Sequence, residues 1–456
     1  MDSHQTSFPS YEPTCSYTKP TVKSSQVKTC QFRHNANPLK LVRRRRLVRL
    51  IESSAIASML DITVTDPETH KGGTVSFVDF KVTITTDDPR FQLRNFFVRR
   101  RYSDFKWLRG QLTLNFPGCI VPPLPPADNP AKALKGEIKS FAPDFIARRQ
   151  AGLELFLRRV AAHHQLVAAP DLVTFLEAKV WELQTAKNAS SSTLLDSMLD
   201  STEASLRKYA IMMQKKTPDD AEVEGLRAFA SEYYSVVEAA ARAHQATVST
   251  IADAAGDLSN LGPAFDLLSQ SERELSLPFT HMARELDALR ELFLKQVQAE
   301  GVSGLSALLT FNAGMAASLK DVLKNRDHAQ LEFSKSSQVL DLRTKERQSW
   351  QMANADKPPP SPRADQSLVA RMFSADPLKG QKLQTKVMEA ERELEEAQGI
   401  WDEINKSISV EALSFHRTTN IDFAHGLREH INQQLAFEDA QQQHWRQLLA
   451  VFEKVP

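Results

Sequence analysis

The sequence has few of the residues that cross-link a fold or interrupt its helices. In 456 residues there are 3 cysteines and 15 glycines. Cys15, Cys30 and Cys119 are odd in number and widely spaced, so they cannot form a disulfide framework, and no two have the CxxC spacing of a zinc site. We therefore expect neither a disulfide-stabilised fold nor a metal-centred one.

Long hydrophobic runs and catalytic signatures are also missing. No stretch approaches the roughly 18 uncharged apolar residues of a membrane-spanning helix, and Met1 to His4 lack the basic and apolar regions of a secretory signal. The loops GxxxxGK(S/T), HExxH and GxSxG, which mark common phosphate-binding, zinc-protease and hydrolase sites, are absent from the sequence. We expect a cytosolic protein that is not an enzyme and needs no cofactor.

The formal net charge of +1 conceals two unlike parts. Residues 1–188 contain 28 Lys and Arg against 17 Asp and Glu, a charge of +11, whereas residues 189–456 contain 29 against 39, a charge of −10. This asymmetry indicates a basic module that meets an anionic surface, joined to an acidic module with another role.

Residues 1–57 are expected to form a disordered, basic N-terminal region. About the first 38 are rich in Ser, Thr, Pro, Lys and Gln, so folding cannot bury enough apolar surface to offset the entropy of ordering. Arg43 to Arg46 then form an uninterrupted basic run. A solvated charged segment is the favoured interpretation, and a membrane-surface or nuclear-import patch is the alternative.

From residue 58 the pattern changes to that of a small α+β domain. Alternating apolar residues predict three antiparallel strands, at 60–64, 75–84 and 96–98. Gly72-Gly73 supplies a turn, and the second strand has a possible bulge. Helical spacing predicts three helices, at 103–115, 143–162 and 171–183. The proline-rich segment 120–126 must be extended.

Residues 218–456 predict an all-α region. Few breakers interrupt the stretch from Thr217 to Trp350, and a proline tract at 357–362 separates it from the next helix. That helix carries a seam of apolar residues in alternating steps of four and three, Leu383, Val387, Ala390, Leu394, Ala397, Trp401, Ile404 and Ile408. Three helices of roughly 55, 70 and 80 residues are expected, and helices this long cannot cover their apolar faces within one chain. We therefore expect a dimer.

The intervening segment, 184–217, is expected to be a linker that contains an amphipathic helix. Leu195, Leu199 and Leu206 belong to an apolar stripe at helical spacing, with basic residues toward its end. Such a helix can lie in the headgroup layer and insert these leucines. Alternatively, the same stripe packs on a neighbouring domain.

The sequence from Arg99 to Leu108 carries the first informative cluster for binding. Three arginines, a tyrosine and a serine stand where a strand passes into a helix. A guanidinium group matches phosphate oxygens, a helix N-terminus adds free backbone N–H groups, and an aromatic face can lie under a sugar-like ring. A basic strand end beside an aromatic core residue is also common, so the cluster alone leaves a phosphate site and a packing feature open.

Two later segments supply context for this cluster, Ile120-Val121-Pro122-Pro123-Leu124-Pro125 and Phe145-Ile146-Ala147-Arg148-Arg149 with Leu153 and Phe156-Leu157. Together with Arg-Arg-Tyr-Ser-Asp-Phe at 100–105, they resemble the PX (phox homology) domain of the sorting nexins over about residues 58–183. Trp-Glu-Leu at 181–183 and Val-Leu-Lys-Asn-Arg-Asp at 322–327 resemble the branch that contains sorting nexins 7 and 30. The resemblance implies that 218–456 is a BAR domain, a dimeric three-helix module that binds curved membranes.

The resemblance also implies a pocket for phosphatidylinositol 3-phosphate. By motif, Arg101 would hold the 3-phosphate, and Tyr102 would stack on the inositol ring. Ser103 would contact the phosphate through its hydroxyl or its backbone. Arg149, four residues after the helix phenylalanine, would hold the 4- and 5-hydroxyls.

One element of the family pattern is missing. Family members usually continue the proline loop with Glu-Lys, whose lysine contacts the 1-phosphate, but Pro126 and Ala127 stand at these positions. Lys132 and Lys135 are the candidates to replace it, although their spacing differs. The loss of one charged phosphate contact, worth about 1.5–3 kcal/mol, would weaken binding without necessarily abolishing it.

The proline loop has three competing interpretations. The resemblance implies that Ile120, Val121 and Leu124 dip into the lipid interface beside the pocket. The loop could instead be a rigid connector, or a PxxP ligand for an SH3 domain. We rank membrane contact first, then the connector, then the SH3 ligand.

The sequence thus predicts an α+β PX domain followed by a dimerising BAR domain. The expected role is that of a peripheral protein of early endosomes, which binds phosphatidylinositol 3-phosphate and senses or supports curvature in endosomal sorting. The alternative is a soluble coiled-coil scaffold whose PX-like module binds proteins. A homodimer and a heterodimer with another sorting nexin both remain open, as do the cargo and a role in autophagy, and no nucleic-acid partner is expected.

Overall fold

A computed structural model describes residues 60–70, 77–126, 143–180, 182–185, 220–302, 304–355 and 377–454. The predicted N-terminal region 1–57, with its run Arg43 to Arg46, lies outside the described residues. So do the turn at Gly72-Gly73 and the predicted amphipathic helix of the linker 184–217.

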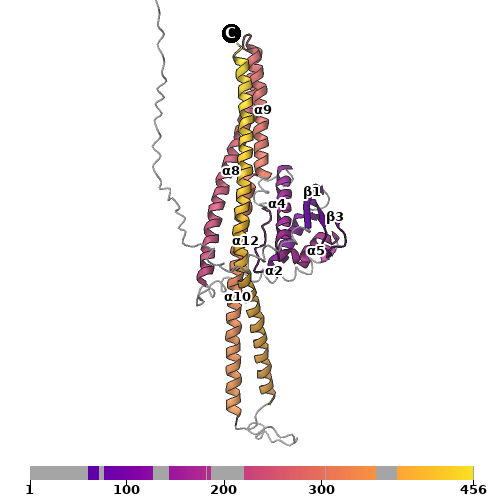
Figure 1. Cartoon of the computed structure of the whole chain (residues 1–456), viewed down its shortest axis with the longest axis vertical. Helices are drawn as coiled ribbons and strands as arrows, with labels where there is room; N and C mark the ends of the chain where they lie inside the picture. The colour runs from indigo at the N-terminus through magenta and orange to yellow at the C-terminus, as the bar shows by residue number, and fades with distance from the viewer. Residues whose placement is uncertain are drawn as a thin grey trace, which may run out of the picture. The chain divides into compact units, whose positions relative to one another are not determined.

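The first structural layer is a three-stranded antiparallel sheet in the order β1-β2-β3 (Figure 1). Its strands are β1 (Leu60–His70), β2 (Phe77–Thr86) and β3 (Asn95–Arg101). Ile62 pairs with Ile84, and Val64 with Val82. These four side chains are buried, as the alternation of apolar residues predicts.

The sheet contains one irregularity, and we predicted it in the wrong strand. The register between β1 and β2 shifts between Thr65 and Glu68, so the extra residue lies in β1 rather than in the second strand, where we expected a bulge. Asp66 adopts a positive φ of 47°, a conformation that aspartate tolerates better than most side chains. The prediction rested on apolar spacing, and Asp66 lies among polar residues that carry no such pattern.

Helices pack against the sheet to complete one core. They are α2 (Tyr102–Asn115), α4 (Pro143–Ala162), the short 3₁₀ helix η3 (Leu166–Ala168) and α5 (Pro170–Glu177). Phe105 lies at the centre, with its ring centroid 5.0 Å from that of Phe175 and 6.5 Å from that of Phe156. The helix predicted at 171–183 is divided, because α5 ends at Glu177 and helical backbone resumes at Val180.

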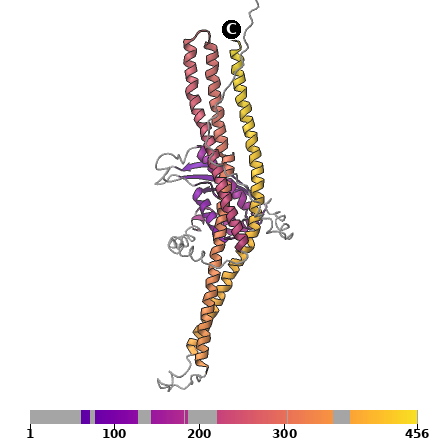
Figure 2. The same ribbon diagram turned by 90° about the vertical axis from the view of Figure 1, so that its left-hand side faces the viewer.

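The remaining described residues form long helices: α8 (Asp220–Ser271), α9 (Ser276–Val302), α10 (Leu305–Asn354) and α12 (Pro377–Phe452). Three helices were expected, but the middle one is broken at Gly304, which is extended with φ −80° and ψ −168°. Helix α8 packs against α9 and α10, and α12 packs against α10 and α9. Figure 2 shows α8 and α9 as a hairpin, with α12 as the yellow helix beside it.

The apolar seam of α12 faces other helices as predicted. Most of the seam residues are at most 4% exposed: Leu383, Val387, Ala390, Ile404 and Ile408. Trp401 stacks on Phe333 of α10, with ring centroids 5.6 Å apart and planes inclined by 6°. In the described chain, the seam therefore serves intramolecular packing.

The described residues include one stretch that is apolar enough to cross a membrane. An 18-residue window within Ser276–Asn354 reaches a mean hydropathy of 1.3, although we expected no such run. Part of this window is buried inside the protein, 41% of it, and the same stretch contains Ala316, Leu319 and Leu323 of α10, which are fully buried between helices. A core helix meets the same compositional criterion without any membrane.

Candidate functional site

Three successive arginines at the end of β3 have three different environments. Arg100 is 1% exposed and points into the domain. Its Nε donates to the carbonyl oxygen of Phe175 at 2.7 Å, and its Nη2 donates to the carbonyl oxygen of Ala178. Burial lowers the pKa of Arg100 to about 10, with the Asp104 charge opposing the shift, so the group stays charged at neutral pH. Arg100 therefore ties β3 to the end of α5.

Arg99 is engaged by acidic side chains of the neighbouring strands. Its Nε and Nη2 donate to Oδ1 of Asp79 at 2.8 and 2.6 Å, and its Nη1 lies 3.1 Å from Oε1 of Glu68. The hydrogen bond to Asp79 raises the pKa of Arg99 above its ordinary value. These contacts make Arg99 a component of the sheet rather than of a ligand site.

Arg101 is the most exposed of the three, with 39% of its side chain accessible. It is the N-cap residue of α2, and its backbone N–H donates to Oδ2 of Asp104 at 2.9 Å. Its guanidinium lies 5.8 Å from the ring centroid of Phe77. Arg101 thus stands beside a helix N-terminus, where backbone N–H groups favour an anion.

Tyr102 and Arg149 are in direct contact. The Cζ of Arg149, on α4, lies 4.5 Å from the ring centroid of Tyr102 and 4.3 Å from that of Phe145. The hydroxyl of Tyr102 donates to the carbonyl oxygen of Pro125 at 2.7 Å. Since Arg149 already lies over the Tyr102 ring, a ligand ring that stacks on Tyr102 must share this ring or replace the guanidinium.

The fold therefore brings most of the predicted pocket residues together. Arg101, Tyr102 and Ser103 are consecutive at the start of α2, with Ser103 exposed, and Arg149 reaches them from α4. Their roles toward a lipid stay predictions. Lys132 and Lys135 lie outside the described residues, as do Leu195, Leu199 and Leu206.

The structure corrects the interpretation of the proline loop. Ile120 is 3% exposed and Val121 is 2% exposed, so neither side chain reaches a lipid interface and this prediction is wrong for both. Val121 belongs to the core around the sheet, whereas Ile120 joins a cluster with residues of α8, α10 and α12. Leu124 is half-buried against the core around the sheet, and its membrane contact stays a prediction. The connector interpretation describes the loop best.

Hydrogen bonds hold the same loop against the long helices. Arg109 of α2 donates from Nε to the carbonyl oxygen of Pro122 at 3.1 Å and from Nη2 to Oγ of Ser318 at 3.2 Å. Asn325 of α10 donates to the carbonyl oxygen of Pro117 at 3.1 Å. Burial lowers the pKa of Arg109. Sequence reasoning assigned no role to Arg109, because a lone arginine in a helix carries no pattern, and it marked Asn325 only as part of the 322–327 motif, without its contact to the loop.

A second set of contacts joins α4 and the loop to α12. The backbone N–H of Ile120 donates to Oε2 of Glu411 at 2.9 Å, and Nε2 of His163 lies 3.0 Å from Oε1 of the same carboxylate. Arg159 forms an ion pair with Asp422. Glu411 is 2% exposed, so a buried charge is satisfied from two directions at this junction.

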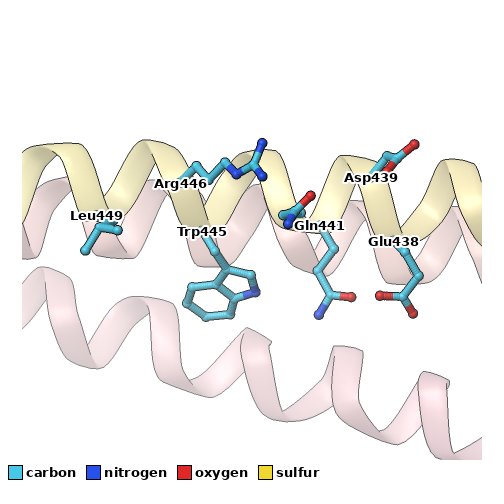
Figure 3. Close-up of a pocket in the computed structure, with 7 residues that line it drawn as sticks. Glu438, Asp439, Gln441, Trp445, Arg446 and Leu449 are labelled. Atoms are coloured by element: carbon cyan, nitrogen blue, oxygen red, sulfur yellow. The ribbon is translucent and has the colours of Figure 1, made fainter.

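The far part of α12 carries a partly open apolar surface. A cavity of about 510 Å³ is lined by residues of α12 alone, among them Trp445 and Leu449, which are 44% and 58% exposed. Figure 3 shows Trp445, Gln441 and Glu438 on one side of the helix, and Arg446 and Asp439 on the other. Further exposed apolar residues precede the cavity on α12: Leu427, Ile431 and Leu435. We call these five exposed apolar residues the α12 apolar strip.

Known proteins share this architecture. The PX domain family matches residues 88–179, within the predicted limits 58–183. Sorting nexin-7 of Homo sapiens is 29% identical over 285 residues, which are 62% of this chain and 70% of that protein. Sorting nexin-30 of Xenopus tropicalis is 27% identical over 292 residues, which are 63% of this chain and 62% of that protein.

A solved structure extends the likeness to the long helices. The cryo-EM structure of the SNX-BAR Mvp1 tetramer superposes with a TM-score of 0.56 at 15% identity, over 85% of this chain and 99% of that chain. It supports the fold of a PX domain followed by helices of the BAR type. The chain therefore contains a PX domain and, over most of its length, is similar to sorting nexins with PX and BAR domains, sorting nexin-7 and sorting nexin-30 among them.

Proposed function

We propose that the chain is a peripheral membrane protein that binds phosphatidylinositol 3-phosphate on the cytoplasmic side of early endosomes. The observation that carries the proposal is the difference in environment among the three arginines at the end of β3. Arg99 and Arg100 are held by acidic or backbone partners over 2.6–2.7 Å. Arg101 pairs with Asp104 over a longer distance, 3.5 Å, and is more exposed at a helix N-terminus, next to the Arg149–Tyr102 pair. A phosphomonoester gains charge-assisted hydrogen bonds from such a fork and from the helix amides together.

The proposed binding is weak for a single chain. The family lysine is missing, and one charged phosphate contact is worth about 1.5–3 kcal/mol. Two linked copies would compensate, because the second headgroup binds at a high effective concentration once the first is held. Dimerisation is thus a functional requirement of the proposal.

The α12 apolar strip supports a dimer. Its five residues are between 41% and 59% exposed, and contiguous exposed apolar surface marks interaction sites. Its proposed occupant is a second copy of this chain or the corresponding helix of another sorting nexin. A dimer of this kind would sense or support membrane curvature during endosomal sorting, although the acidic C-terminal part limits its own attraction to anionic lipid.

Liposome co-sedimentation tests the lipid proposal. The purified chain is expected to bind vesicles that contain phosphatidylinositol 3-phosphate at least about tenfold more tightly than vesicles of equal charge that contain phosphatidylserine instead. Arg101→Ala should remove this preference, since about 1.5–3 kcal/mol per charged contact corresponds to tenfold or more. Arg94→Ala is the matched control, because Arg94 is 84% exposed and pairs only loosely with Asp87, at 3.5 Å.

The opposite result supports the second candidate function, a coiled-coil scaffold whose PX domain binds proteins. If wild type shows no preference for the 3-phosphoinositide, or if Arg101→Ala equals wild type, lipid reading by this pocket is wrong. The missing lysine and the Arg149 that already covers Tyr102 favour this candidate. It further predicts a cytosolic distribution that does not change when cells are depleted of 3-phosphoinositides.

A further inference from the structure

A carboxylate is buried where the long helices meet at the break of the middle one. Glu300, near the end of α9, is 1% exposed. Its Oε2 accepts from the backbone N–H of Leu305, the first residue of α10, at 3.1 Å, and its Oε1 accepts from Nε2 of Gln434 at 3.1 Å. Gly304 lies so close that a Cβ there would stand 2.3 Å from Oε2. The chain thus folds tightly around this single charge.

Two histidines approach the carboxylate from two other helices. Nε2 of His244, on α8, lies 3.1 Å from Oε2 of Glu300, and Nδ1 of His430, on α12, lies 2.8 Å from Oε1. The two rings meet edge to face, with centroids 5.2 Å apart. Their side chains are only 14% and 17% exposed. Side chains from three helices, α8, α9 and α12, therefore place atoms that can ligate a metal close to one another.

The two histidines do not make equivalent hydrogen bonds. Nε2 of His244 has the geometry of a hydrogen bond to Glu300. Nδ1 of His430 is buried and makes no hydrogen bond of normal geometry within the described residues, although it lies 2.8 Å from Oε1 of Glu300. Since two lone pairs repel at 2.8 Å, the approach of Nδ1 to Oε1 requires either a proton on Nδ1 or a cation held between the two atoms.

Another cluster of similar composition behaves differently. Cys119, His163 and Glu411 also lie within 4.8 Å of one another. However, Nδ1 of His163 accepts from the backbone N–H of Leu166 at 3.2 Å, which places the proton on Nε2, where it is donated to Glu411. The Cys119 thiol donates to Gln165. Each atom of that cluster has its partner, so it offers no open ligand set.

We propose that His244, Glu300 and His430 form a binding site for a divalent transition-metal ion of the Zn²⁺ class. The three ligand atoms lie within 4.8 Å of one another, with nitrogen–oxygen approaches of 3.1 and 2.8 Å. Ligands at about 2.0–2.1 Å from a tetrahedral zinc ion stand about 3.3 Å apart, so small side-chain movements close the site. Two imidazoles and one carboxylate are a known three-ligand zinc set, and water takes the fourth position.

Ligand chemistry selects the class of metal. Two nitrogen donors disfavour Ca²⁺ and Mg²⁺, which take oxygen ligands, and favour zinc and its neighbours. The metal binds neutral imidazoles, so binding releases a proton from any histidine that is charged beforehand. The bound ion would pin α8, the α9–α10 break and α12 at one level, which would fix the angle at which the middle helix continues.

Metal titration of the full, untagged chain tests the site. A Cys15→Ser, Cys30→Ser background removes thiols that would compete for the metal. We expect about one Co²⁺ per chain, with the visible absorption of a four-coordinate ion, displaced by one equivalent of Zn²⁺. His244→Ala and His430→Ala should each weaken binding by about a hundredfold or more. His328→Ala is the control, because His328 is exposed on α10.

A second readout does not depend on the metal spectrum. Zn²⁺ should raise the unfolding temperature of the parent chain and of His328→Ala, since it binds the folded state, but should not raise that of His244→Ala. The proposal is overturned if Co²⁺ shows no saturable four-coordinate binding below about 10 μM, or if both histidine variants retain parent affinity. None of these measurements involves lipid, so they stand apart from the proposed function.

Discussion

Identical side chains acquire different roles at the end of β3 because a strand alternates its faces. Arg100 pairs with Phe80, which is fully buried, and therefore points to the core face, whereas Arg99 and Arg101 point away from it. The interior offers Arg100 two backbone carbonyl groups rather than a carboxylate. A basic triplet in a sequence is thus not three equivalent phosphate ligands.

Replacing Arg100 should affect stability rather than lipid choice. Arg100→Met leaves the carbonyl groups of Phe175 and Ala178 buried without their donors, which costs about 1–3 kcal/mol each at most. We expect a lower thermal unfolding midpoint and an unchanged preference among phosphoinositides in the folded fraction.

Arg99→Met is the comparison for this variant. It removes ion pairs at a partly exposed position, for which about 0–1 kcal/mol is usual, so its midpoint should move less. A stable Arg100→Met protein that has lost its headgroup preference would contradict the structural role.

At the scale of elements, periodic patterns of apolar residues correctly predicted the strands and helices that bury one face. The alternation in β1 and β2, the helix from Pro143 to Ala162 and the seam of α12 all have an apolar face that repeats, and each is confirmed. The break at Gly304 and the bulge at Asp66 depend on single residues and their local backbone, which periodicity does not record.

The proline loop shows why contacts between distant parts of the chain could not be predicted from the sequence. Its extended conformation follows from its prolines, but its burial depends on partners far along the chain: Ile120 and Glu411 are 291 residues apart. Apolar residues on a loop are equally compatible with a lipid interface and with a second protein surface. In the pocket, the motif supplied Arg101, Tyr102, Ser103 and Arg149, whereas the stacking of Arg149 on Tyr102 required coordinates.

Truncating Ile120 distinguishes packing from membrane contact. Ile120→Ala should lower the free energy of unfolding by about 2–4 kcal/mol, because it opens a cavity in the cluster shared with α10 and α12. Denaturant unfolding, monitored by loss of helix signal, measures this change.

Leu114→Ala serves as the control for that experiment. Leu114 is 65% exposed on α2, and such a surface change should stay within about 0.5 kcal/mol. If Ile120→Ala leaves stability intact and reduces vesicle binding instead, the loop contacts lipid after all.

At the scale of the whole molecule, charge and apolar surface are divided between the parts. Residues 189–456 carry −10, whereas residues 1–188 carry +11, to which residues 1–57 contribute +7 and the PX range 58–183 contributes only +3. The part of the chain whose charge suits an anionic surface is therefore the N-terminal part as a whole, more than the PX domain alone. The C-terminal helices offer the α12 apolar strip instead, which is the proposed surface for a second chain.

Placing charge on the α12 apolar strip should weaken self-association. Trp445→Glu combined with Leu449→Glu would bury two carboxylates in the proposed interface, a large cost without partners. Light scattering at fixed concentration should show a shift from dimer to monomer, while helix content stays the same.

Met352→Glu is the control for charge itself, since Met352 is 78% exposed near the end of α10. A double variant that remains as dimeric as wild type would place the dimer interface elsewhere. A wild-type chain that is monomeric alone would direct attention to a heterodimer.

The position of the proline loop affects how genetic variants of this chain should be interpreted. Residues from Pro117 to Pro125 contribute contacts to the core around the sheet and to the long helices at once. A screen that measures only recruitment to membranes would interpret a disruptive substitution in this loop as the loss of a lipid-binding residue. The substitution would in fact disrupt the packing between the core around the sheet and the core of the long helices. A phenotype caused by a substitution in this loop therefore reflects the packing of the two cores first, and affects headgroup binding only as a result.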